Sequence, residues 1–246
     1  MTRLLVSVRD ADEALAAAGA GADFIDLKDP AAGALGGLAP ARIAKIVPVL
    51  RARCPEIPIS ATVGDLDAHE RETILRRVAD VAACGVDYVK VGVSPCAAAA
   101  PLLSALARCG APVVPVLLAD LGVDAALVEA ALRQRAFPAL MLDTSDKRGG
   151  SLLQRVPVEV LARFVALVQG WNCLAGLAGA LRADDAAALR KLAPDFAGFR
   201  SAVCEGGRAG PLDPQRVRGL RLRLAMFTVG SRPRPAHTQS EDRARA

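Results

Sequence analysis

Residues 139–169 contain one complete succession of strand, loop and helix, with the sequence ALMLDTSDKRGGSLLQRVPVEVLARFVALVQ. The apolar run Ala139–Thr144 has the length of a buried strand. The segment Pro157–Gln169 repeats Val, Leu and Phe at helical spacing. Pro157 fits the first turn of this predicted helix, where the missing N–H costs nothing. A strand followed by a covering helix is the unit from which parallel sheets are built.

The same alternation continues in both directions along the chain, for example with a helical pattern over Asp67–Cys84. Eight such units predict an α/β fold with a single (β/α)8 TIM barrel, and 246 residues are the length that one barrel needs. The predicted strands are Leu4–Val8, Phe24–Lys28, Ile57–Val63, Tyr88–Val93, Val113–Ala119, Ala139–Thr144, Asn172–Leu177 and Phe196–Val203.

A doubly wound open sheet is the rival fold, and it normally carries a glycine-rich phosphate loop directly after its first strand. Here the first predicted strand leads into Arg9 and Asp10, and no glycine follows until Gly19. We therefore predict a barrel domain over residues 1–227. The remaining residues, 228–246, are rich in Pro, Arg and polar side chains without periodicity, which predicts a disordered tail.

Composition argues against several other classes of protein. The apolar runs are interrupted well before the roughly 18 residues of a membrane span, and the N-terminus lacks a signal-peptide core, so we expect a cytoplasmic protein without a membrane partner. The net charge of +5 comes largely from the tail and from arginines at 216–223, and no aromatic residues accompany these arginines to stack against bases. We therefore expect no nucleic-acid partner. The two histidines, His69 and His237, cannot reach a barrel mouth, so no metal site is expected.

Three lysines fall at the ends of even-numbered predicted strands, where barrel enzymes place their reacting groups: Lys28, Lys90 and Lys147. The chain has only five lysines against 26 arginines. A buried amine can lose its proton and attack a carbonyl, whereas a guanidinium stays charged. This pattern favours lysine chemistry in one pocket. The alternative is that Lys28 and Lys90 only balance nearby aspartates in ion pairs at the barrel rim.

Two aspartates accompany these lysines. Asp26 lies two residues before Lys28 on the same predicted strand, so both side chains point to the same side, and Asp143 ends the sixth strand. A carboxylate beside a reactive amine can transfer protons during imine formation. Either aspartate could instead cap the helix that follows its strand.

Glycine-rich turns after the last two strands predict a phosphate site, because barrels commonly bind phosphate there through exposed N–H groups. A fixed cation could come from Arg200. Tight βα turns are the alternative explanation of these glycines. The candidate phosphate-binding residues are Gly176, Gly179 and Ala180 after strand 7, Arg200 in strand 8, and Gly206 and Gly207 after strand 8.

Several of these segments, in this order, resemble the (5-formylfuran-3-yl)methyl phosphate synthases of methanofuran biosynthesis. The resemblance spans about residues 4–224, and one expected glycine near Ser201 is missing. The Arg-rich and Ala-rich composition is typical of a bacterial, one-carbon-metabolising member. The segments that carry the resemblance are Phe24–Pro30 with Gly33–Gly36, Ser60–Asp65, Tyr88–Gly92, and Met141–Thr144 with Lys147.

The resemblance implies a lyase that condenses two molecules of glyceraldehyde 3-phosphate into a phosphorylated furan aldehyde, with release of phosphate and water and with no cofactor. It implies that Lys28 forms a Schiff base and that Lys90 accepts a proton, with Asp26, Asp143 and Lys147 assisting. We also expect a homo-oligomer. The alternative function is a class I aldolase or isomerase that acts on another small sugar phosphate.

Overall fold

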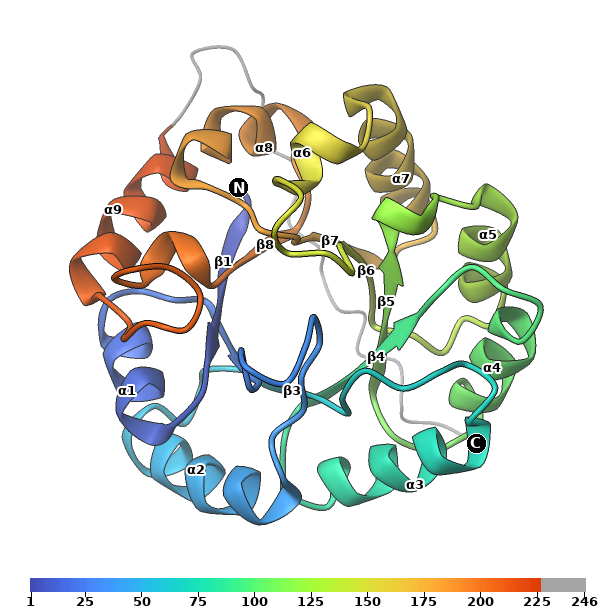
Figure 1. Cartoon of the computed structure of the whole chain (residues 1–246), viewed down its shortest axis with the longest axis horizontal. Coiled ribbons are helices and arrows are strands. Elements are labelled where there is room, and N and C mark those ends of the chain that lie inside the picture. Colours follow the sequence, from blue (N-terminus) through green and yellow to red (C-terminus); the bar gives the residue numbers. More distant parts are fainter. Residues whose placement is uncertain (227–246) are drawn as a thin grey trace, which may run out of the picture.

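The computed structural model describes residues 1–226, and it forms a closed barrel of eight parallel strands in the order of the sequence (Figure 1). Strand β1 pairs with both β2 and β8, which closes the ring and confirms the predicted fold. The predicted tail, residues 228–246, lies outside the described residues. The strands are β1 Arg3–Val8, β2 Phe24–Leu27, β3 Ile59–Thr62, β4 Tyr88–Val93, β5 Val113–Leu118, β6 Ala139–Asp143, β7 Leu174–Leu177 and β8 Phe196–Phe199.

Helices form an outer ring around the strands (Figure 1). Asp10, Asp124 and Asp213 begin three of them, and each side chain accepts hydrogen bonds from N–H groups of the first turn. None of the helices within residues 1–226 is long and apolar enough to cross a membrane. The helices are α1 Ala11–Gly19, α2 Pro40–Arg53, α3 Arg71–Ala82, α4 Ala99–Leu106, α5 Ala125–Arg133, α6 Leu152–Arg155, α7 Val158–Gly170, α8 Ala186–Leu192 and α9 Pro214–Ala225.

The predicted element boundaries agree best in the middle of the chain and worst at β8. Strand β4 coincides with its prediction, but β8 ends at Phe199, and a 3-10 helix, η3 Ser201–Val203, follows where more strand was predicted. The backbone turns at Arg200, whose side chain is anchored by surrounding residues. The helix predicted from Asp67 begins only at Arg71, so His69 lies in the preceding turn.

Helix α9 closes the outer ring against the beginning of the chain. Its Arg221 pairs with Asp23, which lies just before β2, and its Arg223 lies 3.3 Å from Asp184 beside α8. Two of the arginines at 216–223 therefore join neighbouring βα units. These structural arginines account for part of the net positive charge of the chain.

The inside of the barrel has an apolar lower half and a polar upper half. Side chains alternate along each strand, so one set packs between strands and helices and the other fills the barrel. Leu5, Phe24 and Phe196 form the lower filling. A Cβ on Gly176 would lie 2.3 Å from the Phe196 ring, so this glycine makes room for the filling. The polar residues gather above, at the carboxyl ends of the strands.

Candidate active site

A cavity opens at the carboxyl ends of the strands. The structure brings all three predicted lysines and both predicted aspartates into its wall, although they come from strands and loops more than 100 residues apart. Its further lining consists of Leu5, Ser7, Met141, Ala178, Gly179, Ala180, Leu181, Gly198, Phe199, Arg200, Ser201 and Arg208.

Lys28 follows directly after β2 and is only 4% exposed. Among residues 1–226, its amine has no hydrogen-bond or ion-pair partner. Burial, which removes water from the ammonium form, lowers the pKa of Lys28 to about 8; Asp143 and Asp26 oppose this shift, while Lys147 and Lys90 reinforce it. A substantial fraction of this amine is therefore neutral near physiological pH, in the state that attacks carbonyl carbons.

Lys90 points into the same cavity from β4 and forms a buried ion pair with Asp26, with 3.0 Å between Nζ and Oδ1. Asp26 also accepts hydrogen bonds from the hydroxyl groups of Ser60 at 2.8 Å and Ser7 at 2.9 Å. Burial alone would raise the pKa of Asp26, but the Lys90 and Lys28 ammonium groups and these hydrogen bonds lower it below its usual value. Asp26 is thus an ionised carboxylate beneath the cavity.

A second ion pair lines the same cavity. Lys147, in the loop after β6, donates to Asp143 at the end of that strand, and Asp143 also accepts from the Thr144 N–H at 2.7 Å. Burial would raise the pKa of Asp143, but the charges of Lys147 and Lys28 and these hydrogen bonds lower it. Lys28 therefore interacts with two ionised carboxylates that are each already paired with another lysine.

The predicted phosphate loop after β7 reaches the cavity through Gly179 and Ala180. Both have positive φ angles, +115° and +45°, and a Cβ on Gly179 would lie 2.8 Å from Thr144. Within the described residues, the N–H groups of Ala180 and Ser201 have no acceptor. Both residues line the cavity, and Ser201 begins η3.

Three other predicted phosphate ligands lie elsewhere. Gly176 is within β7 against Phe196, and Gly206 and Gly207 form a turn with φ angles of +63° and +98° outside the cavity wall. The tight-turn explanation fits Gly206 and Gly207, whereas Gly176 makes room for the Phe196 ring within β7. The structure does not place these three glycines in the cavity wall. The sequence could not show this, because a glycine in a βα loop looks the same whether its N–H faces a ligand or solvent.

Arg200 does line the cavity, but its guanidinium is fully occupied. It donates to both oxygens of Glu13, at 2.5 and 3.1 Å, and to the carbonyls of Ser7, Arg208 and Gly210. These bonds use all five donors, so Arg200 fixes the β8–α9 loop rather than supplying a free cation to phosphate. Sequence reasoning could not foresee this, because Glu13 is 187 residues away.

Sequence reasoning also missed Ser7, Ser60 and Arg208. The two serines are inward positions of strands, and their alternation with apolar residues is a usable signal. Arg208 had no signal, because it is one of many arginines and its loop has no periodicity. Arg208 reaches the site through hydrogen bonds to the backbone of residues 30–34 on the other side of the barrel mouth.

The fold and this cavity define a single (β/α)8 barrel whose candidate active site brings together three lysines and two aspartates. The sequence model of the 4-HFC-P synthase family matches residues 4–221, and the chain belongs to that family. The (5-formylfuran-3-yl)methyl phosphate synthase of Methanopyrus kandleri is 34% identical to it, over 91% of this chain and 99% of that protein. A protein of Methylorubrum extorquens, provisionally given the same name, is 41% identical over 87% and 88%.

A solved structure supports the fold independently. Phosphoribosyl anthranilate isomerase from Thermotoga maritima superimposes with a TM-score of 0.64, covering 91% of this chain and 98% of that one. The sequence identity is only 17%, so this likeness concerns the barrel and not its chemistry.

Proposed function

We propose that this enzyme condenses two molecules of glyceraldehyde 3-phosphate into (5-formylfuran-3-yl)methyl phosphate, also called 4-(hydroxymethyl)-2-furancarboxaldehyde phosphate, for a methanofuran-type cofactor. One inorganic phosphate and two waters are lost, which makes the enzyme a lyase. The observation that carries the proposal is the amine of Lys28, which is buried and unpaired among the described residues and has a pKa near 8, while both neighbouring lysines are held in ion pairs.

In this proposal, the neutral Lys28 amine attacks the aldehyde carbon, and loss of water gives a cationic imine. The imine withdraws electrons from the adjacent carbon, so a base can remove the proton there and leave an enamine. Lys90 is assigned this step: its ammonium group first passes a proton to the Asp26 carboxylate, and the resulting neutral amine then accepts the proton from the carbon. Lys147 and Asp143 are assigned proton exchange with the substrate oxygen on the other side. Hydrolysis of the final imine frees Lys28.

The substrate phosphate is assigned to the corner formed by the N–H groups of Ala180 and Ser201. Two unoccupied donors and a glycine that permits close approach support this placement. Lys28 lines the same cavity, so a three-carbon aldehyde anchored there by its phosphate can present its carbonyl to the amine. That the enzyme works as a homo-oligomer in the cytoplasm stays a prediction.

Product analysis tests the proposed reaction. Incubation with glyceraldehyde 3-phosphate alone is expected to give an ultraviolet-absorbing six-carbon aldehyde phosphate and one free phosphate per aldehyde, measured by mass spectrometry and phosphate assay. A class I aldolase would require a second carbonyl substrate and would release no phosphate. Formation of a saturated sugar phosphate without phosphate release would contradict the proposal and favour that alternative.

Gly179→Val is expected to weaken phosphate binding. The new side chain meets Thr144, and the φ angle of +115° disfavours any side chain, so the corner must shift. The inhibition constant of inorganic phosphate should rise by about tenfold, the loss of one or two hydrogen bonds to an anion. Gly219→Ala, on α9, is the control, since a Cβ there meets open space and the φ angle is not positive. Unchanged inhibition in a folded Gly179→Val protein would remove the phosphate from this corner.

A further inference from the structure

The loop between β2 and α2 is held in place by side chains from two distant segments of the chain. Residues 29–38, here called the cover loop, extend from Lys28 inside the ring of helices (Figure 1). Leu35 in this loop is 1% exposed, and a Cβ on Gly92 of β4 would lie 2.7 Å from it. The cover loop therefore packs over the upper end of the barrel beside the lysine cavity.

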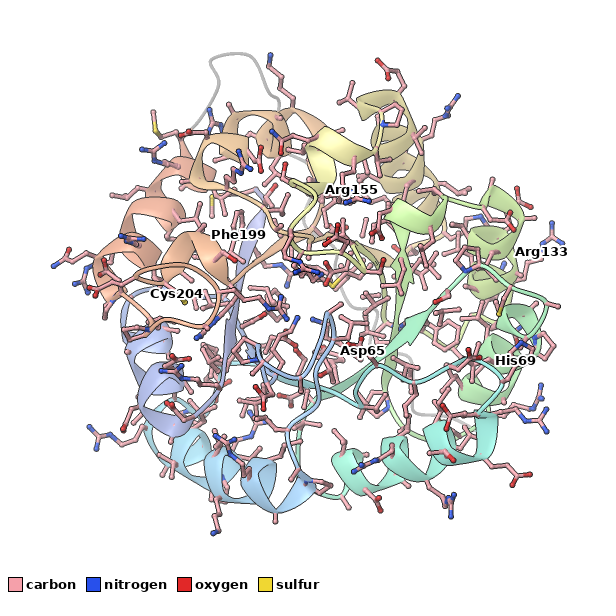
Figure 2. All side chains as sticks on the ribbon, in the orientation of Figure 1. Asp65, His69, Arg133, Arg155, Phe199 and Cys204 are labelled. Carbon is pink, nitrogen blue, oxygen red and sulfur yellow. The ribbon has the colours of Figure 1, made fainter. Side chains whose placement is uncertain are left out.

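One side of the cover loop is fixed by β3 and the loop after it. Asp65, which Figure 2 shows inside the ring of helices, accepts a hydrogen bond from the Leu35 N–H at 2.9 Å. The Thr62 hydroxyl donates to the Gly36 carbonyl at 3.0 Å. A Cβ on Gly33 would lie 2.0 Å from the Asp65 carboxylate, so the backbone and this side chain are in close contact.

The opposite side of the cover loop is fixed by one residue of the β8–α9 loop. Arg208 donates from Nε to the Pro30 carbonyl at 3.1 Å, and from Nη2 to the carbonyls of Gly33 at 2.6 Å and Ala34 at 3.3 Å. Arg208 also lines the lysine cavity, and it has no carboxylate partner among residues 1–226. One guanidinium thus joins segments 175 residues apart across the mouth.

We propose that Arg208 is a positioning residue which, together with Asp65, holds the cover loop closed over Lys28 and thereby directs the enamine toward the second aldehyde instead of water. Both side chains bind the loop through its backbone, the carboxylate through an N–H and the guanidinium through carbonyls. The side chains of residues 31–34, which are Ala or Gly, therefore make none of these hydrogen bonds. A fixed cover excludes water from the intermediate, as loops do in other barrel enzymes.

This inference rests on the proposed function, and its chemistry predicts a specific side product. The enamine formed from one glyceraldehyde 3-phosphate can expel its phosphate from the adjacent carbon. If water then hydrolyses the imine before a second aldehyde adds, a three-carbon dicarbonyl and one phosphate leave, and Lys28 is regenerated. Overall, one triose phosphate gives one dicarbonyl and one phosphate, with no oxidant or reductant. A loosened cover should therefore raise the phosphate released per furan formed.

Hydrogen exchange tests the closure itself, whatever the reaction is. In Arg208→Ala and in Asp65→Ala, the amides of residues 31–38 should exchange faster than in the wild type by about tenfold, because each change removes charge-assisted hydrogen bonds to this loop. Arg53→Ala, at the exposed end of α2, is the control and should leave that exchange unchanged. Equal protection in wild type and Arg208→Ala would overturn the closure.

Product partition tests the consequence. Arg208→Ala and Asp65→Ala should both keep the borohydride-trapped adduct on Lys28 but release several phosphates per furan, whereas the wild type releases one. If only Arg208→Ala were affected, and only through a higher KM, Arg208 would be a substrate contact and the positioning role would be wrong. An unchanged ratio in both variants, together with faster exchange, would also contradict the proposal. If the wild type made no furan, the proposed function would fail while the exchange result stood.

Discussion

Lys28→Met is expected to abolish turnover and, at the same time, to stabilise the protein at neutral pH. Removal of a covalent nucleophile costs at least about a thousandfold in turnover. The stability gain arises because Lys28 is buried with a pKa lowered from 10.5 to about 8. Keeping its ammonium form folded at pH 7 therefore costs about 3 kcal/mol, which a methionine of similar shape avoids.

The pH dependence of this gain has a defined sign. Below pH 8, both folded and unfolded chains hold the proton and the wild type carries the full penalty. Between pH 8 and 10.5, the unfolded state binds more protons, so wild-type stability rises with pH. The difference in unfolding free energy between Lys28→Met and wild type should thus shrink from pH 7 to pH 10, measured by urea denaturation. Lys45→Met, at an exposed site on α2, should change neither turnover nor stability. A Lys28→Met protein that is less stable at pH 7 would contradict the buried, unpaired amine.

Asp26→Asn is expected to have the largest destabilising effect of any single change in the site. Asp26 is fully buried and is the partner of the Lys90 ammonium at 3.0 Å. Its replacement leaves a buried charge without an opposite charge, which typically costs about 3–5 kcal/mol. Turnover should also fall by about a hundredfold or more, because the proton transfer assigned to Lys90 loses the Asp26 carboxylate that takes part in it.

The double variant Asp26→Leu with Lys90→Met separates the two effects. Replacing a buried ion pair by apolar side chains is often neutral for stability, so urea denaturation should return toward the wild-type midpoint. Turnover should stay low, because both proton-transfer groups are gone. If Asp26→Asn alone unfolded at the wild-type midpoint, the Asp26–Lys90 pair would not be an ionised pair, and the assignment of Lys90 would lose its basis.

The convergence of the lysines could be predicted because strand ends in a barrel meet at one mouth. Lys28 and Asp143 are at or next to strand ends in the sequence and Lys90 lies within β4, and in the structure all three line one cavity. The sequence could not tell which lysine stays unpaired. That depends on which carboxylate each side chain can reach: Lys90 on β4 reaches Asp26 on β2, with β3 between them, and Lys147 reaches Asp143. Lys90 therefore forms an ion pair of the kind that the alternative described, whereas Lys28 forms none among the described residues.

The loops were less predictable because their contacts join distant parts of the chain. The turn at Arg200 that ends β8 depends on Glu13 in α1, and the cover loop depends on Arg208. Neither pairing leaves a local pattern. The strands and helices, in contrast, follow from hydrophobic periodicity within each segment.

Trapping of the imine tests the central claim most directly. The enzyme is incubated with glyceraldehyde 3-phosphate and sodium borohydride at several pH values, then digested and analysed by mass spectrometry. The account predicts inactivation with a reduced adduct on the peptide that contains Lys28, at a rate that rises with pH and is half-maximal near pH 8, where half of the amine is neutral. Lys28→Met should give no adduct. An adduct on Lys90 or Lys147, with Lys28→Arg still active, would contradict the account.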